Sequence, residues 1–491
     1  MLTIDPDVTG PDDEARGGRG ASRRSAWAAA ALRPVDIASL AAFRIIFGAV
    51  MCLGILRFLA TGWIEPMYVE PRWFFSYPGF AWVSPWPGWG MYLHYAVLAG
   101  LALAIALGAF HRVVTLLFVV GFAYTQLIDV TNYLNHHYLV VLLGVQLALL
   151  PANAAWSIDA RRRPALRRSS VPAWMVWLLR FQVGVVYVFA GLAKAKLDWL
   201  VHGQPLNLWL AARTDTPVIG PLFARPWAGL AMAWAGFAFD STIVLWLSWR
   251  RTRLVAYAAV IAFHGLTGAL FNIGLFPFLM TSSALIFFSP SWPRRVLGRF
   301  GARDRRRADP DAAGDSPRAD PGEASRPPSV DPPPGRGVRA VIAIHVAVQL
   351  ALPLRHFAYP GDVLWNEDGM RFAWHVLIRE KHGKVAFVAV FADGRRLEVP
   401  AHDYLTGRQD REMAGQPDLI LQLAHAIGRD LEARGYRGFE LHAVTAVSLN
   451  GRAPAAMIDP AVDLLTIRDL GPRTWVLPAP PGPPPTVRPP R

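Results

Sequence analysis

The chain has 491 residues, of which 53% are hydrophobic and only 18% are charged, and its mean hydropathy is +0.26. These values argue against a soluble domain and are typical of a membrane protein whose charges gather between long apolar segments. The formal net charge of +14 does not indicate nucleic-acid binding, because the arginines border apolar segments and no nucleic-acid motif accompanies them. The single cysteine, Cys52, excludes an intrachain disulfide and a thiolate metal site.

The beginning of the chain is polar and then basic, and no cleavable signal sequence follows it. We therefore expect a disordered cytoplasmic tail over residues 1–36 and a helical membrane domain over 37–295. Each apolar segment is near the length that crosses the hydrocarbon core of a bilayer, and we count about nine. The predicted spans are 37–59, 92–110, 113–129, 136–152, 172–193, 226–248, 254–271, 274–289 and 337–354.

The basic segments give the predicted orientation. If the spans alternate from a cytoplasmic N-terminus, the segments at 160–168, at 250–253 and after 293 all fall on the cytoplasmic side. Basic loops favour that side of a membrane. The pattern predicts a multi-pass protein of the cell inner membrane whose residues after 355 lie outside the cytoplasm.

The C-terminal third has the composition of a linker and a water-soluble domain. Residues 296–336 are rich in Arg, Pro, Ala and Gly, which predicts a basic disordered linker before the last transmembrane helix over 337–354. We expect an extracytoplasmic α+β domain over 355–478 and a Pro-rich tail over 479–491. The predicted fold class is a polytopic α-helical membrane protein with this α+β domain at its C-terminal end.

Local patterns predict three elements of this domain. Asp393-Gly394 between β-rich runs indicates a hairpin, and Asn450-Gly451 ends another strand. A helix that stops at Gly435 carries apolar residues on one face. These residues are Ile420, Leu423, Ala424, Ile427 and Leu431.

Polar side chains in the spans are the candidates for function, because they are costly in a bilayer. In the predicted topology His136 and His137 open the fourth span at its external end, and Lys194 closes the fifth there. Asn272 lies at the external end of the seventh span, with His264 two turns deeper. Convergence of such groups at one membrane depth favours a site.

Each candidate also has a structural interpretation. The two histidines suit an interface, Arg44 suits a snorkelling side chain, and Asp240 and His264 suit hydrogen bonds between helices. Lys194 and Lys196 are two positions apart and face different sides of a helix, so one can snorkel while the other points into the bundle.

The sequence has no GxSxG, HExxH or phosphate-loop motif. Neutral histidines, an asparagine and a lysine in apolar surroundings suit base chemistry on an organic cofactor, because desolvation favours the neutral amine.

Several segments, in order, resemble the vitamin K-dependent gamma-glutamyl carboxylases and their bacterial relatives with the horizontally transferred transmembrane (HTTM) domain. The resemblance runs from about Ala41 to Val476, interrupted by the basic linker. "LNHHYL" resembles the family's Asn-His-x-Tyr-Leu motif, and "AGLAKAKLDW" resembles the segment that holds its catalytic lysine, here Lys194. "FHGLTGALFNIGLFPFLMTSSALIFFSPSWPRR", "NEDGMRFAW" and "VSLNGRAPAAMIDPAVDLL" are similar as well.

The resemblance implies a membrane enzyme, of the carboxy-lyase type, that couples oxidation of reduced vitamin K to its epoxide with CO2 addition to peptide glutamate. It implies Lys194 as the base, with His136 and Asn135 stabilising reactive intermediates. The implied quinone-binding residues are Tyr138, His264 and Asn272, and the implied substrate-binding residues are Arg213, Trp374 and Phe372.

The implied cofactor is reduced vitamin K or menaquinol, with O2 and CO2 as co-substrates and no metal. The implied partners are a glutamate-containing protein or peptide and the lipid bilayer, with no nucleic acid. The linker composition indicates a bacterium, and the chain lacks the cysteines for the disulfide of the animal enzymes, so we do not expect a clotting-type propeptide substrate. Two alternatives stay open, a quinol-dependent enzyme with another substrate and a non-catalytic quinone- or lipid-binding membrane protein.

Overall fold

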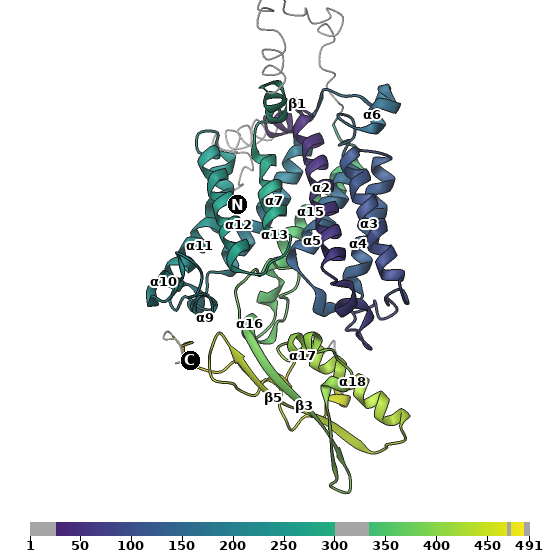
Figure 1. Ribbon diagram of the computed structural model, residues 1–491, viewed down its shortest axis with the longest axis vertical. Coiled ribbons are helices and arrows are strands. Elements are labelled where there is room, and N and C mark those ends of the chain that lie inside the picture. The colour runs from purple at the N-terminus through teal and green to yellow at the C-terminus, as the bar shows by residue number, and fades with distance from the viewer. Residues whose placement is uncertain (1–25, 300–332, 469–472, 486–491) are drawn as a thin grey trace, which may run out of the picture.

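A computed structural model of the protein describes residues 26–299, 333–468 and 473–485. A bundle of long helices forms one half of the molecule, and a smaller α+β domain lies at one end of it (Figure 1). β1 (Pro34–Asp36) and α6 (Ile158–Arg162) lie at the opposite end of the bundle. The predicted fold class is confirmed.

Each of the nine predicted spans coincides with an apolar helix in the part of the chain that the structure describes. Six are long and apolar enough to cross a bilayer, and three are shorter. The long ones are α2 (Ala38–Ala60), α3 (Gly90–Leu107), α7 (Ala173–Ala193), α11 (Pro226–Ser248), α12 (Arg253–Leu270) and Arg336–Ala358, which begins as α15 (Arg336–Ala351). The shorter ones are α4 (His111–Leu127), α5 (Asn135–Leu149) and Phe276–Phe287, which begins as α13 (Phe276–Ser283).

The first transmembrane helix, α2, contains Arg44, whose side chain does not reach toward the membrane surface as the sequence-based interpretation expected. Arg44 is fully buried and donates to the carbonyls of Ile105 and Ala106 at the end of α3 and to those of Ala152 and Trp156. The last carbonyls of a helix lack intrahelical partners and carry partial negative charge. Arg44 therefore caps α3 and ties it to the segment after α5.

Part of the predicted tail and linker has regular structure. Residues 26–32 are helical, and β1 pairs antiparallel with β2 (Ser170–Pro172), so residues 26–36 are not a disordered tail. Residues 292–299 also form a helix, which extends into the predicted linker. Residues 1–25, 300–332 and 486–491, which hold most of the predicted tails and linker, lie outside the described residues.

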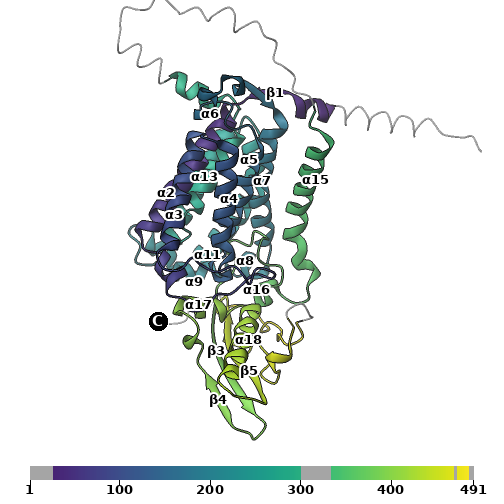
Figure 2. The ribbon, with the colours of Figure 1, turned by 90° about the vertical axis from the view of Figure 1, so that its right-hand side faces the viewer.

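Helix α15 lies at the edge of the bundle (Figure 2), and Gln349 is its only buried residue. Polar side chains join it to α5 and α7. Gln349 accepts from Gln182 at 3.3 Å and donates to the Tyr138 hydroxyl at 2.9 Å, while His345 Nε2 lies 3.0 Å from Gln182 Oε1. A buried hydrogen-bond network, rather than apolar packing, therefore attaches this helix.

The C-terminal domain contains an antiparallel sheet with strand order β4-β3-β5. The strands are β3 (Lys381–Phe391), β4 (Arg396–Val399) and β5 (Phe439–Leu449), and α17 (Gly407–Met413) and α18 (Pro417–Ala433) complete the domain. The β3–β4 hairpin turns at Gly394, which has a φ of +82°, and Asn450-Gly451 follows β5 with positive φ at both residues. All five predicted apolar residues of α18 are buried. The predicted hairpin, helix and turn are confirmed.

Short helices line the junction between the two halves. These are α8 (Leu197–Leu200), α9 (Leu206–Ala211), α10 (Gly220–Phe223) and α16 (Val363–Asn366). Asp198 of α8 receives two hydrogen bonds at 2.7 Å from the guanidinium of Arg452, and Gln409 of α17 donates to Asp129 at 2.8 Å. These buried and half-buried polar contacts fix the domain against the end of the bundle.

Candidate active site

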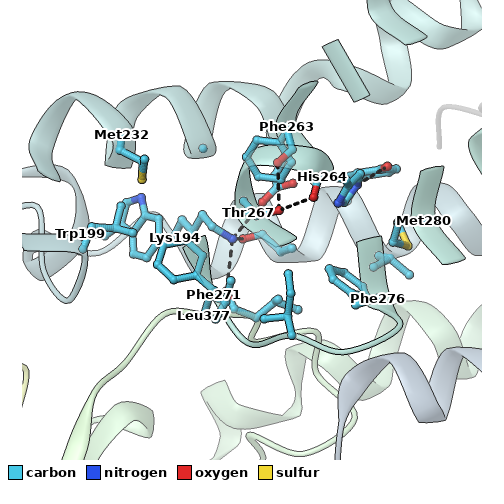
Figure 3. Close-up of a pocket in the computed structure, with 18 residues that line it drawn as sticks. Lys194, Trp199, Met232, Phe263, His264, Thr267, Phe271, Phe276, Met280 and Leu377 are labelled. Carbon is cyan, nitrogen blue, oxygen red and sulfur yellow. Dashed lines mark hydrogen bonds and ion pairs between the residues drawn. The ribbon is translucent and has the colours of Figure 1, made fainter. Parts of the chain in front are cut away.

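A pocket lies between α7, α11, α12 and α13, at the end of the bundle that faces the C-terminal domain (Figure 3). Its walls are mostly apolar and aromatic, and they include Trp199, Met232, Phe263, Phe271, Phe276 and Met280. Val376 and Leu377, from the segment before β3, also line it. Both halves of the molecule therefore contribute to the pocket.

Lys194 follows the last residue of α7, and its side chain turns into this pocket. The side chain is only 5% exposed. Nζ lies 2.9 Å from an Asp240 carboxylate oxygen and donates to the carbonyls of Ala190 at 3.2 Å and Val376 at 3.3 Å. The Trp199 ring centroid is 5.3 Å away. Lys194 thus lies inside the bundle, as predicted.

The surroundings of Lys194 differ from the prediction in one important respect. The expected setting was apolar and favoured a neutral amine, but Asp240 from α11 places a buried carboxylate beside Nζ. The surroundings of Nζ are therefore polar on this side, where the carboxylate forms a buried ion pair with the lysine. The sequence-based interpretation was that Asp240 joins helices by hydrogen bonds. It does join α11 to the end of α7, but its partner is the predicted catalytic base.

A glycine allows this contact. An added Cβ at Gly191 would lie 2.6 Å from Ser241 Oγ and 2.8 Å from its backbone nitrogen. Because glycine has no side chain, α7 can approach α11 closely at this point. The point lies one turn before Lys194 on α7 and one residue after Asp240 on α11.

A second polar pair lines the same pocket. The Tyr187 hydroxyl lies 3.0 Å from His264 Nε2, and both side chains are buried. His264 Nδ1 is buried without a hydrogen-bond partner among the described residues. Tyr187 precedes Lys194 by seven residues, which places both on the same face of α7. The pocket therefore combines apolar walls with two polar pairs, one of which has an unsatisfied nitrogen.

Five of the other predicted site residues gather beside the pocket, around the start of α5. Asn135 donates to the His375 carbonyl at 3.1 Å, and the ring of His136 packs on Phe276 at 5.8 Å. Phe276 lines the pocket, whereas His136 is not among the lining residues. Tyr138 stacks on Trp374 at 5.2 Å and meets Phe372 edge-on at 5.0 Å.

The 372–377 segment connects this cluster to the pocket. Phe372, Trp374 and Leu377 all have positive φ, between 53° and 63°, which is strained for residues with bulky side chains. The Phe372 N–H donates to the Tyr133 hydroxyl at 2.7 Å. Two further hydrogen bonds, from Asn135 to the residue 375 carbonyl and from Lys194 to the residue 376 carbonyl, hold the segment across the end of the bundle.

Two predicted site residues are not brought to the pocket. Asn272 is exposed in the turn between α12 and α13, where its neighbours Phe271 and Ile273 line the pocket instead. Arg213 is exposed after α9 and is not among the lining residues. Lys196 is 33% exposed and lies 3.5 Å from Asp362 of the C-terminal domain, so it points outward as predicted.

Sequence reasoning missed Asp240, Tyr187 and Trp199 as pocket residues. Trp199 is buried and donates from Nε1 to the Ala233 carbonyl at 2.8 Å. The signals were present, because an intramembrane aspartate needs a partner and Tyr187 shares a helix face with Lys194. No pattern pointed to His375, which lies in an irregular segment.

The arrangement defines a class of protein, a polytopic membrane protein with a buried lysine pocket closed by an extracytoplasmic-type domain. Residues 32–292, more than half of the chain, match the HTTM domain, and residues 335–481 match the lumenal domain of vitamin K-dependent gamma-carboxylase. The chain belongs to the vitamin K-dependent gamma-carboxylase family, as its segments predicted. No solved structure matches it.

Proposed function

We propose that the protein is an integral membrane gamma-glutamyl carboxylase that couples oxidation of a reduced vitamin K-type quinone, to its epoxide, with CO2 addition to peptide glutamate. The observation that carries this proposal is the position of Lys194. It is a buried amine in an apolar pocket of a carboxylase-family membrane protein, held by α7, α11 and the 372–377 segment.

The pocket suits a reduced quinone, which is a flat apolar ring with a hydroxyl at each end. Phe263, Phe271 and Phe276 supply aromatic walls, and the two polar pairs supply partners for the hydroxyls. The buried Nδ1 of His264 has no partner among the described residues, and leaving such a nitrogen unpaired costs free energy. A ligand oxygen would satisfy it.

When bound, a reduced quinone supplies the electrons and, with O2, the strong base that removes a glutamate γ-proton. Lys194 Nζ would accept a proton from a ligand hydroxyl and would then provide a positive charge at that end of the pocket. Asp240 positions Nζ and keeps the charge paired. The apolar walls exclude water, which would quench a strong base.

The cluster around α5 suits the second substrate. Asn135 and His136 lie at the junction with the extracytoplasmic domain, and Phe372 and Trp374 lie beside them. A peptide glutamate that arrives from the extracytoplasmic side would meet the pocket at the 372–377 segment. Menaquinol takes the place of vitamin K hydroquinone in this proposal if the chain is bacterial.

The test is incorporation of labelled CO2 into a glutamate peptide by membranes that contain the protein, with O2 and either reduced vitamin K or menaquinol. We expect label with the wild type and with Lys196→Ala, and none with Lys194→Ala. Lys196→Ala is the matched control, because it removes a neighbouring lysine outside the pocket.

The same membranes separate the alternatives. Epoxide formation without label would indicate a quinol-dependent enzyme with another substrate. Neither product, together with quinone binding that survives Lys194→Ala, would replace the carboxylase by a binding protein.

A further inference from the structure

The end of the bundle away from the C-terminal domain carries a positive charge that the described residues do not neutralise. Figure 1 shows α6 at this end, beside the ends of α3 and α4. This helix and the residues after it expose four arginines, and none of them has a carboxylate within 4.0 Å among the described residues. We call these residues the α6 arginine cluster: Arg161, Arg162, Arg163 and Arg167.

The same end of the bundle has further exposed arginines and few acidic residues. Its two described acidic side chains already have partners, because Asp36 pairs with Arg294 at 2.9 Å and Asp159 accepts from backbone N–H groups. The four lysines of the chain all lie elsewhere, at positions 194, 196, 381 and 384. The exposed arginines beyond the cluster, also without a described carboxylate partner, include Arg33, Arg112, Arg250, Arg251 and Arg295.

The cluster projects from an element that is fixed to the bundle. Asp159 of α6 accepts from the Phe110 N–H at 2.7 Å and from the His111 N–H at 2.9 Å, where α4 begins. The Ser157 side chain caps α6 by accepting from the Ala160 N–H at 2.9 Å. Because these bonds satisfy the first N–H groups of both helices, they hold α6 and its arginines in one position against α4.

Apolar side chains lie exposed among these charges. Phe110 is 64% exposed, its backbone has a left-handed φ of +48°, and the Arg162 guanidinium carbon lies 5.2 Å from its ring centroid. Trp156 and Leu166 are 36% and 39% exposed. A bulky residue in this backbone conformation is strained, and exposing its ring to water brings no compensating stability. A surface that mixes arginines with exposed rings is typical of the membrane interface, where rings contact acyl chains and cations contact headgroups.

We propose that the α6 arginine cluster binds the phosphate groups of anionic phospholipids, in the leaflet away from the C-terminal domain. Phe110 then lies at the level of the upper acyl chains. A guanidinium group pairs with phosphate through two parallel hydrogen bonds, whereas an ammonium group acts as a point charge, so a surface built from arginines fits this ligand. The interaction goes beyond the proposed function, because it involves neither the pocket nor a quinone.

The test measures lipid binding to the full chain in detergent micelles by native mass spectrometry. Phosphatidylglycerol is compared with phosphatidylcholine that has the same acyl chains, so that the two lipids differ in the headgroup alone. The test variant is Arg161→Gln/Arg162→Gln/Arg163→Gln/Arg167→Gln. The control removes the same charge from exposed positions of the C-terminal domain, as Arg396→Gln/Arg411→Gln/Arg429→Gln/Arg437→Gln.

One basic side chain near an anionic surface favours binding by about fivefold. We therefore expect the wild type and the control to bind phosphatidylglycerol at least about tenfold more tightly than phosphatidylcholine. The test variant should lose about tenfold of this preference, with the melting temperature of the wild type because its four side chains are exposed. Added salt should weaken the preference of the wild type, since the contact is between exposed charges.

Four results overturn the proposal. The first is a wild type without preference for phosphatidylglycerol, and the second is an unchanged preference in the test variant. The third is an equal loss in the control, which would assign the preference to net charge instead of to α6. The fourth is displacement of bound phosphatidylglycerol by inorganic phosphate at equal concentration, which would assign the arginines to free phosphate. Because no quinone enters the assay, none of these results bears on the proposed carboxylase.

Discussion

The effect on stability of breaking the Lys194–Asp240 ion pair can be predicted quantitatively, because both side chains are almost completely buried, at 5% and 8% exposure. Replacing Asp240 by Leu leaves an ammonium group without its counter-charge among apolar walls. Removing one partner of a buried ion pair costs about 3–5 kcal/mol, since the remaining charge keeps its desolvation penalty. We therefore expect Asp240→Leu to lower the free energy of unfolding by that amount.

The double variant Lys194→Met/Asp240→Leu should recover most of this loss, because it removes both charges and fills the space with apolar atoms. The assay is unfolding in mixed micelles, analysed as a double-mutant cycle. Asp362→Asn is the control. It breaks the Lys196–Asp362 pair, whose side chains are 33% and 40% exposed, and should cost less than about 1 kcal/mol. Additive effects of the two pocket substitutions would refute the reasoning.

Three further changes test other parts of the structure. Gly191→Ala puts a Cβ 2.6 Å from Ser241 Oγ, so we expect the free energy of unfolding to fall by about 1–3 kcal/mol and Lys194 to be displaced. Thermal unfolding and epoxide formation measure the two effects, and unchanged values would contradict the close approach of α7 to α11. Gln349→Leu removes the hydrogen bonds of the one buried residue of α15 and should lower the free energy of unfolding by about 1 kcal/mol. Hydrogen exchange should become faster in α15 alone. Burial lowers the pKa of Lys381 from 10.5 to about 8, against the opposing charge of Glu367. Between pH 8 and 10.5 the unfolded chain therefore binds more protons, and the wild type should gain about 3 kcal/mol of stability relative to Lys381→Met as the pH rises; a loss over this range would contradict the sign.

The helices were predictable because membrane insertion depends on local composition. Each span is an apolar run of sufficient length, and every one of the nine coincides with a helix. The hairpin at Gly394 and the apolar face of α18 were predictable for the same reason, since turn chemistry and helical period are properties of short segments.

Partners that come from distant segments were not predictable. Arg44 has the sequence context of a snorkelling residue, but four carbonyls from the ends of α3 and from the segment after α5 surround it. Asp240 and Lys194 are 46 positions apart, and only the close packing of α7 on α11 at Gly191 brings them together. A single sequence shows that such groups need partners and does not show which ones.

The junction between the two halves explains why the site needs both. Lys194 and Asp240 belong to the bundle, but the carbonyl of Val376 that also holds Nζ comes from the strained 372–377 segment. Asn135 fixes that segment from α5, and Asp198 and Asp129 fix the domain behind it. Since backbone strain persists only where the surroundings impose it, loss of these contacts would let the segment relax and withdraw from Lys194. The position of the predicted base is therefore a property of the docked domain as much as of the membrane helices.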